Sequence, residues 1–250
     1  MTIVKLASVA STNKYCEVLD LAEVEDFTCY WALEQTAGIG QRGNHWEAAP
    51  GKNLTFSLVL HPTFLPADRQ FKLTQALSLA LCDCLNDLKD FNDLKVKWPN
   101  DIYVASKKIC GTLVSTHIST QAIKQSNNHA IISSAVCGIG LNVNQTDFPD
   151  WVPNPTSLAL LTGKEYELEP LLKKLLARIE TRYNALRAGQ DPGQEYLARL
   201  LNIDVPARYI YNEREIIATI TGVDSHGRLL LTTSEGQQLS CGMKEITWLG

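Results

Sequence analysis

Residues 94–104 read LKVKWPNDIYV, and this stretch decides the fold because it combines two strand-like runs with the turn between them. The runs 94–98 and 101–104 are rich in β-branched and aromatic residues, which favour strands. Pro99 and Asn100 separate the runs and are typical turn residues. The pattern predicts two strands joined by a turn, with Lys97 near the end of the first strand.

The sequence on either side of this stretch contains further helical and strand-like patterns. Apolar residues recur at helical spacing in 71–88 without an internal Gly or Pro, which predicts a core helix. A second helix is predicted to begin near residue 11, after the N-cap signal Ser11-Thr12-Asn13. Two more helices are predicted at 168–186 and 194–201. Other strands are predicted at 27–34, 54–60, 109–119 and 130–143.

The character of the sequence changes after Asn202. Short alternating runs follow, separated by turn residues, at 206–211, 216–223, 229–233 and 238–243. We therefore expect two domains, residues 1–202 and 203–250, of which the second is a small β-barrel. A piece of this size is too small to be confidently stable alone, so it is predicted to dock against the larger domain.

Composition and charge restrict the class of protein. A chain of 250 residues, 45% hydrophobic and 20% charged, is expected to bury a sizeable core. The formal net charge of −4 argues against a nucleic-acid-binding surface, which normally carries a basic patch. The amino terminus lacks the pattern of a signal peptide, and no segment approaches the roughly 20 apolar residues of a membrane span. We expect a cytoplasmic protein that binds neither nucleic acid nor membrane.

The seven cysteines and five histidines show no metal-ligand spacing. The cysteines are odd in number and include no Cys-x-x-Cys pair, which favours reduced thiols over disulfides. Cys110 and Cys137 lie beside glycines of interest but are expected to fill core space. The histidines follow no zinc-binding pattern, so no structural metal is expected.

The loop 35–46, QTAGIGQRGNHW, could carry chemistry because its three glycines would let backbone amides approach an anion closely. The glycines alone nevertheless favour a long hairpin loop.

Lys97 has two interpretations, and the residues alone favour neither. It could present a positive charge to a phosphate or carboxylate, or it could be a surface lysine beside a turn.

Gly138 and Gly140 alternate inside a predicted strand and form the third stretch of interest. Glycine weakens a strand, so two alternating glycines suggest that a ligand or another backbone comes close on one face. A β-bulge is the alternative explanation.

Taken together, these stretches resemble the biotin protein ligase family from about residue 8 to the carboxyl end. The block Lys97-Trp98-Pro99-Asn100-Asp101 in combination with the others is the specific part of the resemblance. The remaining matching blocks, in the family's order and approximate spacing, are Ser11-Thr12-Asn13, Gln35-Thr36-Ala37-Gly38, Arg42-Gly43-x-x-Trp46, Asn53-Leu54, Lys108-Ile109-Cys110-Gly111, Gly138-Ile139-Gly140-Leu141-Asn142 and Thr156-Ser157-Leu158.

The resemblance implies an α+β fold, in which a mixed-sheet catalytic domain of the biotin/lipoate protein ligase type precedes an SH3-like β-barrel. It implies an enzyme that uses ATP with Mg²⁺ to convert biotin to biotinyl-5'-AMP and then transfers biotin to a lysine of a biotin carboxyl carrier protein. Formation of a homodimer is an expectation from the family alone. The chain begins directly at the catalytic domain, so a DNA-binding regulator is not expected.

The resemblance also assigns residues to the site. Lys97 would meet the carboxylate and phosphate oxygens as the catalytic cation, which agrees with the negative charge that develops there. Trp46 would stack on adenine, and the loop 38–46 would cover the intermediate and exclude water. The biotin-binding residues implied are Ser11, Thr12, Asn13, Gln35, Gly38, Ile39, Gly40, Gln41, Lys97, Gly138 and Gly140. The adenylate-binding residues implied are Arg42, Asn44, Trp46, Lys97 and Asn142.

The chain departs from the family at three positions. Ile39 and Gln41 stand where the family loop has arginines, which should weaken phosphate contacts and leave Arg42 and backbone amides as substitutes. Ser115 replaces an acidic residue that is common after the Lys-x-x-Gly block, with no evident consequence.

Two other functions stay open. A lipoate or octanoate protein ligase shares the fold and chemistry but is not expected to show the KWPND block. A non-catalytic biotin-binding protein would be favoured if Ile39 and Gln41 prevented ATP binding.

Overall fold

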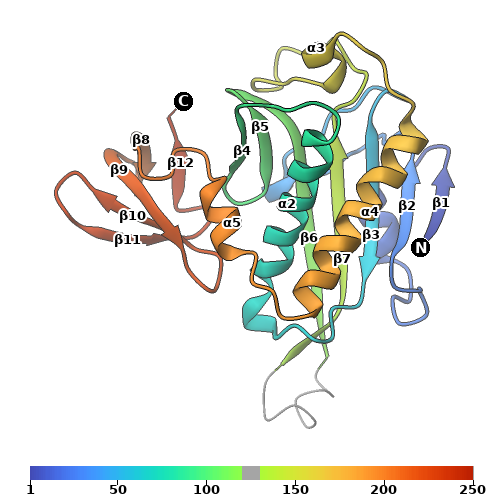
Figure 1. Cartoon of the computed structure of the whole chain (residues 1–250), viewed down its shortest axis with the longest axis horizontal. Helices are drawn as coiled ribbons and strands as arrows, with labels where there is room; N and C mark the ends of the chain where they lie inside the picture. Colours follow the sequence, from blue (N-terminus) through green and yellow to red (C-terminus); the bar gives the residue numbers. More distant parts are fainter. Residues whose placement is uncertain (120–129, 250) are drawn as a thin grey trace.

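Two β-sheets organise the computed structural model, which describes residues 1–119 and 130–249 (Figure 1). The large sheet has seven strands in the order β1-β2-β3-β7-β6-β5-β4, and the small sheet has five in the order β11-β10-β9-β8-β12. In the large sheet β1 and β2 are parallel and the other neighbours are antiparallel. The expected α+β fold, a mixed sheet followed by a small β-domain, is confirmed.

The element bounds follow the chain order. The large sheet contains β1 Thr2–Leu6, β2 Thr28–Ala32, β3 Leu54–Leu60, β4 Leu94–Lys97, β5 Asp101–Val104, β6 Lys107–Ser119 and β7 Ile131–Leu141. The helices are α1 Thr12–Glu17, α2 Phe71–Asn86, α3 Leu158–Thr162, α4 Leu168–Arg187 and α5 Gly193–Ala198, with 3-10 turns at Gln41–Gly43 and Ala67–Arg69. The small sheet contains β8 Pro206–Tyr211, β9 Arg214–Val223, β10 Leu229–Thr233, β11 Gln238–Cys241 and β12 Ile246–Trp248.

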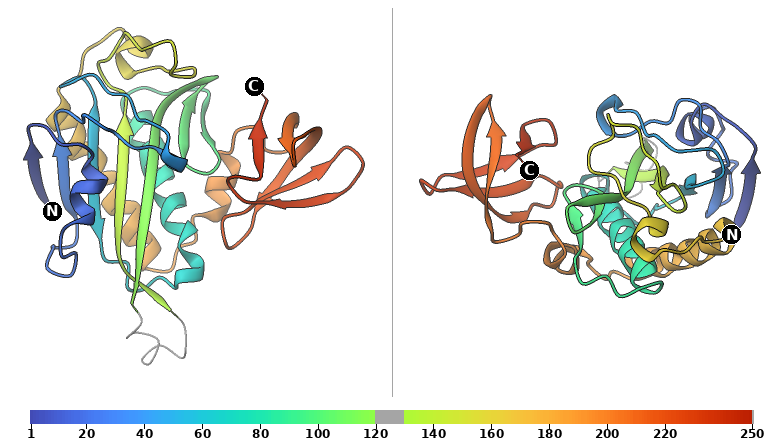
Figure 2. Two further views of the ribbon diagram at one scale, coloured as in Figure 1. Left: turned by 180° about the vertical axis from the view of Figure 1, so that it is seen from behind. Right: turned by 90° about the horizontal axis from the view of Figure 1, so that it is seen from above.

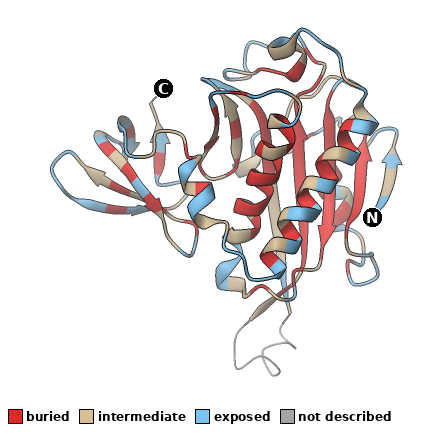
Figure 3. Ribbon diagram, in the orientation of Figure 1, coloured by how far each residue is buried: buried red, intermediate tan, exposed pale blue. Residues whose placement is uncertain are grey.

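The two faces of the large sheet are covered differently. Helices α2 and α4 pack side by side on one face, in front of the sheet in Figure 1 and beyond it in the view from behind in Figure 2. The buried side chains of that layer form the main core, which is red along α2 and the central strands in Figure 3. The short helix α1 covers part of the other face through a small cluster that includes Cys16, Tyr30 and Val136. The rest of that second face is therefore available for a site.

Most predicted elements are confirmed, and three were missed. Strand β1 was not predicted, because it has only five residues of mixed character, none of them buried, and it is a strand through its pairing with β2. Helix α3 and strand β12 were also missed, since five and three residues are too few to show a periodicity. Several ends differ by a few residues, as where the helix predicted at 71–88 ends at Asn86.

The small sheet lies beside the β4 edge of the large sheet, away from β1 (Figures 1 and 2). The indole Nε1 of Trp98, in the turn between β4 and β5, donates to the carbonyl of Gly227 at 3.0 Å. Gly227 lies between β9 and β10, so this hydrogen bond joins the β4–β5 turn to the small sheet. Buried residues of both sheets belong to one hydrophobic cluster, so the predicted docking is confirmed. Among the described strands, no pairing is found between β11 and β12 at the two ends of this order. A domain boundary at 202/203 stays a prediction.

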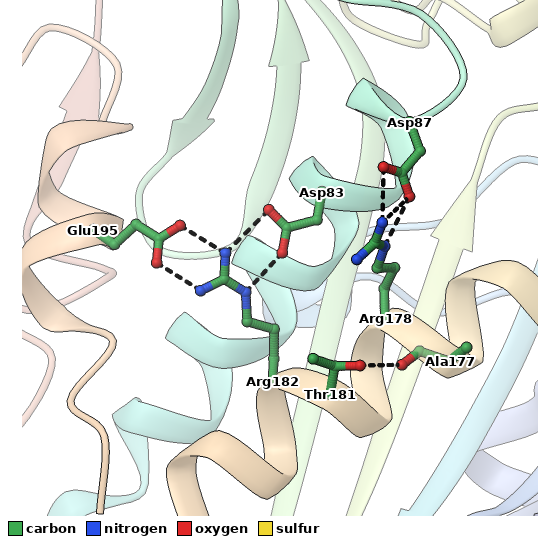
Figure 4. Close-up of polar contacts among 7 residues, drawn as sticks. All are labelled: Asp83, Asp87, Ala177, Arg178, Thr181, Arg182 and Glu195. Atoms are coloured by element: carbon green, nitrogen blue, oxygen red, sulfur yellow. Dashed lines mark hydrogen bonds and ion pairs between the residues drawn. The ribbon is translucent and has the colours of Figure 1, made fainter.

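Ion pairs tie the helices of the outer layer to one another (Figure 4). Arg182 of α4 donates to Asp83 of α2 at 2.7 Å and to Glu195 of α5 at 2.6 Å. Arg178 makes a bidentate pair with Asp87 at 2.7 and 2.9 Å. The Arg182 guanidinium lowers the pKa of Glu195, because it hydrogen-bonds the charged carboxylate. These contacts fix the layer that supports the sheet from the side opposite the open face.

All seven cysteines are free and buried. The side chains of Cys110 and Cys137 are fully enclosed and fill core space, as predicted, and burial raises the pKa of both thiols. Within residues 1–119 and 130–249, no helix is both long and apolar enough to cross a bilayer.

Candidate active site

A cavity of about 320 Å³ opens on the free face of the large sheet, where it meets the loop 38–46 and the last strand of the small sheet. Most residues that the sequence assigned to biotin or adenylate line this cavity. They are Ser11, Thr12, Asn13, Gln35, Ile39, Gly40, Gln41, Asn44, Trp46, Lys97, Gly138 and Gly140. Gly38 and Asn142 lie outside the lining. The side chain of Arg42 lies outside the described part of the structure.

Two rows of paired residues form the floor of the cavity. In the first row Ser57 of β3 pairs with Gly138 of β7, which pairs with Leu113 of β6. In the second row Thr55 pairs with Gly140, which pairs with Gly111. Directly paired residues share one face of a sheet, as do residues two apart in one strand. The three glycines therefore remove side chains from one continuous patch of this face.

Side chains from outside the sheet occupy the space that the glycines leave. A methyl group at position 138 would overlap the Asn13 carboxamide, and one at position 140 would overlap the Trp46 indole. The strand pairing runs through both positions without a shift, so the bulge alternative is wrong there. The close approach predicted from the glycines is present, although side chains rather than a backbone make it.

A cluster of hydrogen bonds forms the polar end of the cavity. Thr36 N and Ala37 N donate to the carbonyls of Val9 and Ala10, which brings the start of α1 next to Gln35. Gln35 Oε1 then accepts from the amide of Thr12 at 2.7 Å and from its hydroxyl at 3.1 Å.

Ser57 completes the polar cluster from the floor of the sheet. Its Oγ donates to Asn13 Oδ1 at 2.6 Å and lies 2.8 Å from Thr12 Oγ1. Ser57 is fully buried, and Thr12 and Asn13 nearly so. These polar groups satisfy one another before any ligand binds, so the polar end is preorganised.

Ser11 caps α1 only by its position. Its backbone is extended, as an N-cap residue requires, yet its side chain makes no capping hydrogen bond and the residue lines the cavity. The hydroxyl that the sequence pattern assigned to the helix is thus at the cavity wall, beside the polar cluster.

The glycine loop closes on itself as a compact hairpin. Ile39 forms a bridge with His45, Gly40 N donates to Asn44 O at 2.7 Å, and Trp46 N donates to Gly38 O at 3.0 Å. Gly43 has a φ of +79°, which the turn at its tip requires and which favours glycine. The hairpin interpretation is confirmed for this conformation, and the amides of Gly40 and Trp46 are used within the loop.

Lys97 lies at the end of β4, where the cavity meets the small sheet. Asp101, its partner across the turn, forms an ion pair with Lys108 at 2.6 Å, and Lys97 takes part in none of the ion pairs found in the described residues. Burial lowers the pKa of Lys97, the Asp101 carboxylate opposes that shift, and the Lys108 ammonium reinforces it. Lys97 is thus a half-buried cation facing a cavity, which excludes the alternative of an ordinary surface lysine.

Two polar atoms near the second glycine row lack partners. Within the described residues, Trp46 Nε1 and Asn142 Oδ1 are buried without a hydrogen bond. The Asn142 side chain is held by donation from its Nδ2 to Thr156 O at 2.9 Å. Buried polar atoms are normally paired, so these two groups mark a place where a ligand could supply the partner. In this respect Trp46 and Asn142 differ from the satisfied polar cluster.

Sequence reasoning missed several residues of this site. Ser57 gave no local signal, because only the register with Gly138 and the position of α1 reveal its role. Gly111 was noted only within the matching block Lys108-Ile109-Cys110-Gly111 and was given no role, although it lies in a strand-like run as Gly138 and Gly140 do. The strand β12, with Ile246, Thr247 and Trp248, was not expected at the cavity.

Comparison with known proteins supplies the family. The model of the Biotin/lipoate A/B protein ligase family matches residues 6–133, more than half of the chain. The chain belongs to this family. It is 28% identical over 235 residues to the Bifunctional ligase/repressor BirA of Bacillus subtilis, covering 91% of this chain and 68% of that protein. It is 29% identical over 245 residues to a biotin–[acetyl-CoA-carboxylase] ligase of Paracoccus denitrificans, covering 94% of this chain and 95% of that protein.

A solved structure supports the fold. A biotin protein ligase from Aquifex aeolicus, determined in complex with biotin and ATP, superposes with a TM-score of 0.78 at 24% identity. The match covers 98% of this chain and 97% of that one, and thus includes both sheets. The fold and the membership of a ligase family therefore agree.

Among residues 1–119 and 130–249, no group of three or more His, Cys, Asp or Glu side chains converges as a metal site would require.

Proposed function

We propose that this protein activates biotin with ATP to biotinyl-5'-AMP and transfers the biotin to a lysine of a biotin carboxyl carrier protein. The observation that carries the proposal is one cavity lined by a preorganised polar cluster, by the half-buried cation Lys97 and by Trp46, whose indole N–H is unpaired among the described residues. The relatives named as biotin ligases and the related structure with biotin and ATP support it.

The polar end suits the ureido head group of biotin, which offers both N–H donors and a carbonyl acceptor. Ser11, Thr12, Asn13 and Gln35 present hydroxyl and amide groups there, and Ser57 holds two of them in place. Ile39 adds an apolar wall for the ring and chain. Gly138 and Gly140 leave room on the floor for the Asn13 carboxamide and the Trp46 indole, and so place one group for each part of the ligand. In this assignment Gly38 shapes the loop instead of touching biotin, since a methyl group there would meet the Trp46 carbonyl.

The chemistry then runs in two displacements. In the first, a carboxylate oxygen of biotin attacks the α-phosphorus of ATP, a new P–O bond forms, and pyrophosphate leaves. In the second, the amine of a carrier lysine attacks the biotinyl carbonyl, the amide forms, the amine loses a proton, and AMP leaves. Negative charge is concentrated between carboxylate and phosphate in the first step. Lys97 stabilises this charge as a preorganised cation that forms no ion pair with a carboxylate among the described residues, since Asp101 pairs with Lys108.

Trp46 and Asn142, which we call the nucleotide end, supply groups for the adenylate. Trp46 offers an aromatic face and an unpaired N–H, and Asn142 offers an unpaired oxygen for an amino group. Ile39 and Gln41 bring no positive charge to the loop, so Lys97 and Lys108 are the cations at the cavity with described side chains. The loop 38–46, with Asn44 and Arg42, would cover the mixed anhydride and slow its hydrolysis.

Other parts of the proposal follow from the same chemistry. Mg²⁺ enters with the nucleotide, as MgATP, and is part of the substrate. The carrier is a protein partner whose identity the cavity does not specify. A cytoplasmic location, a homodimer and a domain boundary at 202/203 belong to this proposal as well.

Intact-mass measurement tests the function. The purified chain is incubated with biotin, MgATP and a biotin carboxyl carrier domain, and the carrier should gain one biotin. Lys97→Ala should abolish the gain, whereas Lys95→Ala, on the same strand but outside the cavity, should retain it. Lipoate or octanoate accepted in place of biotin would overturn the assignment of substrate. Biotin binding without pyrophosphate release would favour a non-catalytic binding protein.

A further inference from the structure

The last strand of the small sheet enters the cavity of the large one. Ile246, Thr247 and Trp248 of β12 line it together with Lys97. Lys97 Nζ lies 5.4 Å from the centre of the Trp248 ring and 5.5 Å from the centre of the Tyr103 ring. The ammonium is thus close to two aromatic side chains, one from each sheet. Both distances are within the range of cation–π attraction.

The position of Trp248 is fixed by the small sheet. Strand β12 pairs with β8, where Trp248 lies opposite Tyr209, and the two rings meet edge to face at 5.3 Å and 68°. Leu249 N donates to Arg208 O at 3.1 Å and extends the pairing past Trp248. Tyr209 is fully buried. The indole over Lys97 is therefore part of the small sheet's own packing.

We propose that Trp248 is a positioning residue that holds the Lys97 ammonium at the cavity, so that adenylate formation depends on docking of the C-terminal sheet. The proposal rests on the proposed function, because Lys97 is the cation assigned to the activation step. Tyr103 holds the same ammonium from β5, within the large sheet.

Aromatic faces suit this task better than a carboxylate would. A carboxylate would neutralise the lysine and compete with an anionic ligand, whereas a ring quadrupole attracts the cation and leaves its charge uncompensated. The nearby carboxylate, Asp101, is bound to Lys108 at 2.6 Å. The arrangement keeps Lys97 ordered but available to a carboxylate or phosphate.

A second contact joins the turn between β4 and β5 to the small sheet. Trp98, the residue after Lys97, donates to Gly227 O at 3.0 Å, and Gly227 packs so tightly on Phe71 that a methyl group would overlap its ring. The backbone of the turn is thus held through Trp98, and the side chain of Lys97 through Trp248. Displacement of the small sheet would release both.

Fluorination of Trp248 distinguishes the electrostatic attraction between the indole ring and the Lys97 ammonium from the space that the side chain fills. Site-specific replacement of Trp248 by mono-, di- and trifluorotryptophan weakens the ring quadrupole stepwise with little change in size. We expect kcat/KM for biotin-dependent ATP–pyrophosphate exchange to fall with each fluorine. Trp248→Leu should lower it by roughly 3- to 30-fold, the range that a cation–π contact supports, and Trp248→Phe should restore part of the loss. Equal rates across the series would overturn the proposal.

The pH profile gives a readout that a merely structural role would not move. The titratable groups facing Lys97 are Tyr103 and Asp101 on β5 and Lys108 on β6, and fluorination changes none of them. Weaker attraction destabilises the charged lysine, so the alkaline limb of the activity profile should shift to lower pH with each fluorine.

An NMR measurement keeps the two proposals distinguishable. After reductive ¹³C-methylation, the Lys97 signal is assigned by its absence in Lys97→Arg. We expect ring currents to shift its methyl protons upfield in the wild type, and Trp248→Leu to remove most of that shift. An inactive wild type with the shift present would contradict the ligase function alone. An active wild type without the shift would contradict the role of Trp248 alone.

Discussion

The two ends of the cavity differ in how fully their polar groups are satisfied. At the polar end, Gln35, Thr12, Asn13 and Ser57 form a closed set of hydrogen bonds within a buried cluster. At the nucleotide end, Trp46 Nε1 and Asn142 Oδ1 are buried without partners among the described residues. One end is complete within the protein, and in the proposed function the other end gains its partners from the nucleotide.

This difference suggests an order of function. A preorganised end can bind a small neutral head group without rearrangement, because its groups already hold their bound positions. In the proposed function, the unpaired polar atoms of the other end cost free energy in the empty protein, and hydrogen bonds from a purine offset that cost. Lys97 lines the same cavity, and in the proposed reaction it serves the step that joins biotin to the nucleotide. Substitutions in each region should therefore affect different measurements.

The largest effect is expected from Lys97→Ala. Loss of a preorganised cation should slow single-turnover pyrophosphate release by about 100- to 1000-fold. Biotin affinity in the absence of ATP should change far less, because the head-group contacts remain. Rapid-quench kinetics and calorimetry measure the two quantities. Equal losses in both would mean that Lys97 binds biotin without acting on the reaction.

The second-largest effect is expected from Gly138→Ala, which should lower both stability and biotin affinity at the polar end. The added methyl group overlaps the Asn13 carboxamide, which Ser57 holds, so the free energy of unfolding should fall by about 1–3 kcal/mol and biotin affinity with it. Gly222→Ala in β9 is the matched control, since its methyl group would make only an ordinary contact with Leu230 at 3.6 Å. Denaturant titration and calorimetry of both variants decide the comparison.

Ser57→Ala should have a moderate effect confined to the polar end. Asn13 Oδ1 would lose its donor in a buried cluster, at a cost of about 1–2 kcal/mol. We expect weaker biotin binding with little change in ATP affinity. Ser57→Thr tests the same group with the hydroxyl retained. A loss of ATP affinity equal to that for biotin would show that the two ends are not independent.

Arg182→Ala should have the smallest effect on the site, because its ion pairs lie on the opposite side of the sheet (Figure 4). The free energy of unfolding should fall by about 1 kcal/mol, since the partners are partly exposed. The folded-state pKa of Glu195 is lowered, so its stabilising contribution is present above the unfolded pKa of about 4.3 and is lost as pH falls through the folded value. The difference from the wild type should therefore shrink below about pH 4, as urea titrations at several pH values will show.

The sequence predicted those parts of the molecule that depend on local patterns. The long helix α2 and the strands around Pro99-Asn100 were found from periodicity and turn residues. Gly138 and Gly140 were singled out correctly, because glycine in a strand requires a nearby reason. Lys97 was identified as a candidate cation, although residues alone left the surface interpretation equally open.

The remaining features depend on contacts between distant segments. Ser57 is one serine in a buried strand, and its role arises from segments 44 and 45 residues away. Trp248 lies in a three-residue strand that only pairing with β8 creates. The conformation of the loop 38–46 follows from its own bridge between Ile39 and His45, which glycine spacing does not specify.

The division of the cavity into two independent ends is tested most directly by calorimetric titration of Trp46→Ala. The variant is titrated with biotin alone and with a non-hydrolysable ATP analogue in the presence of biotin. We predict that biotin affinity stays within about threefold of the wild type, while nucleotide affinity falls by about tenfold or more, as expected for the loss of a stacking face. A fall in biotin affinity as large as that for the nucleotide would contradict the account.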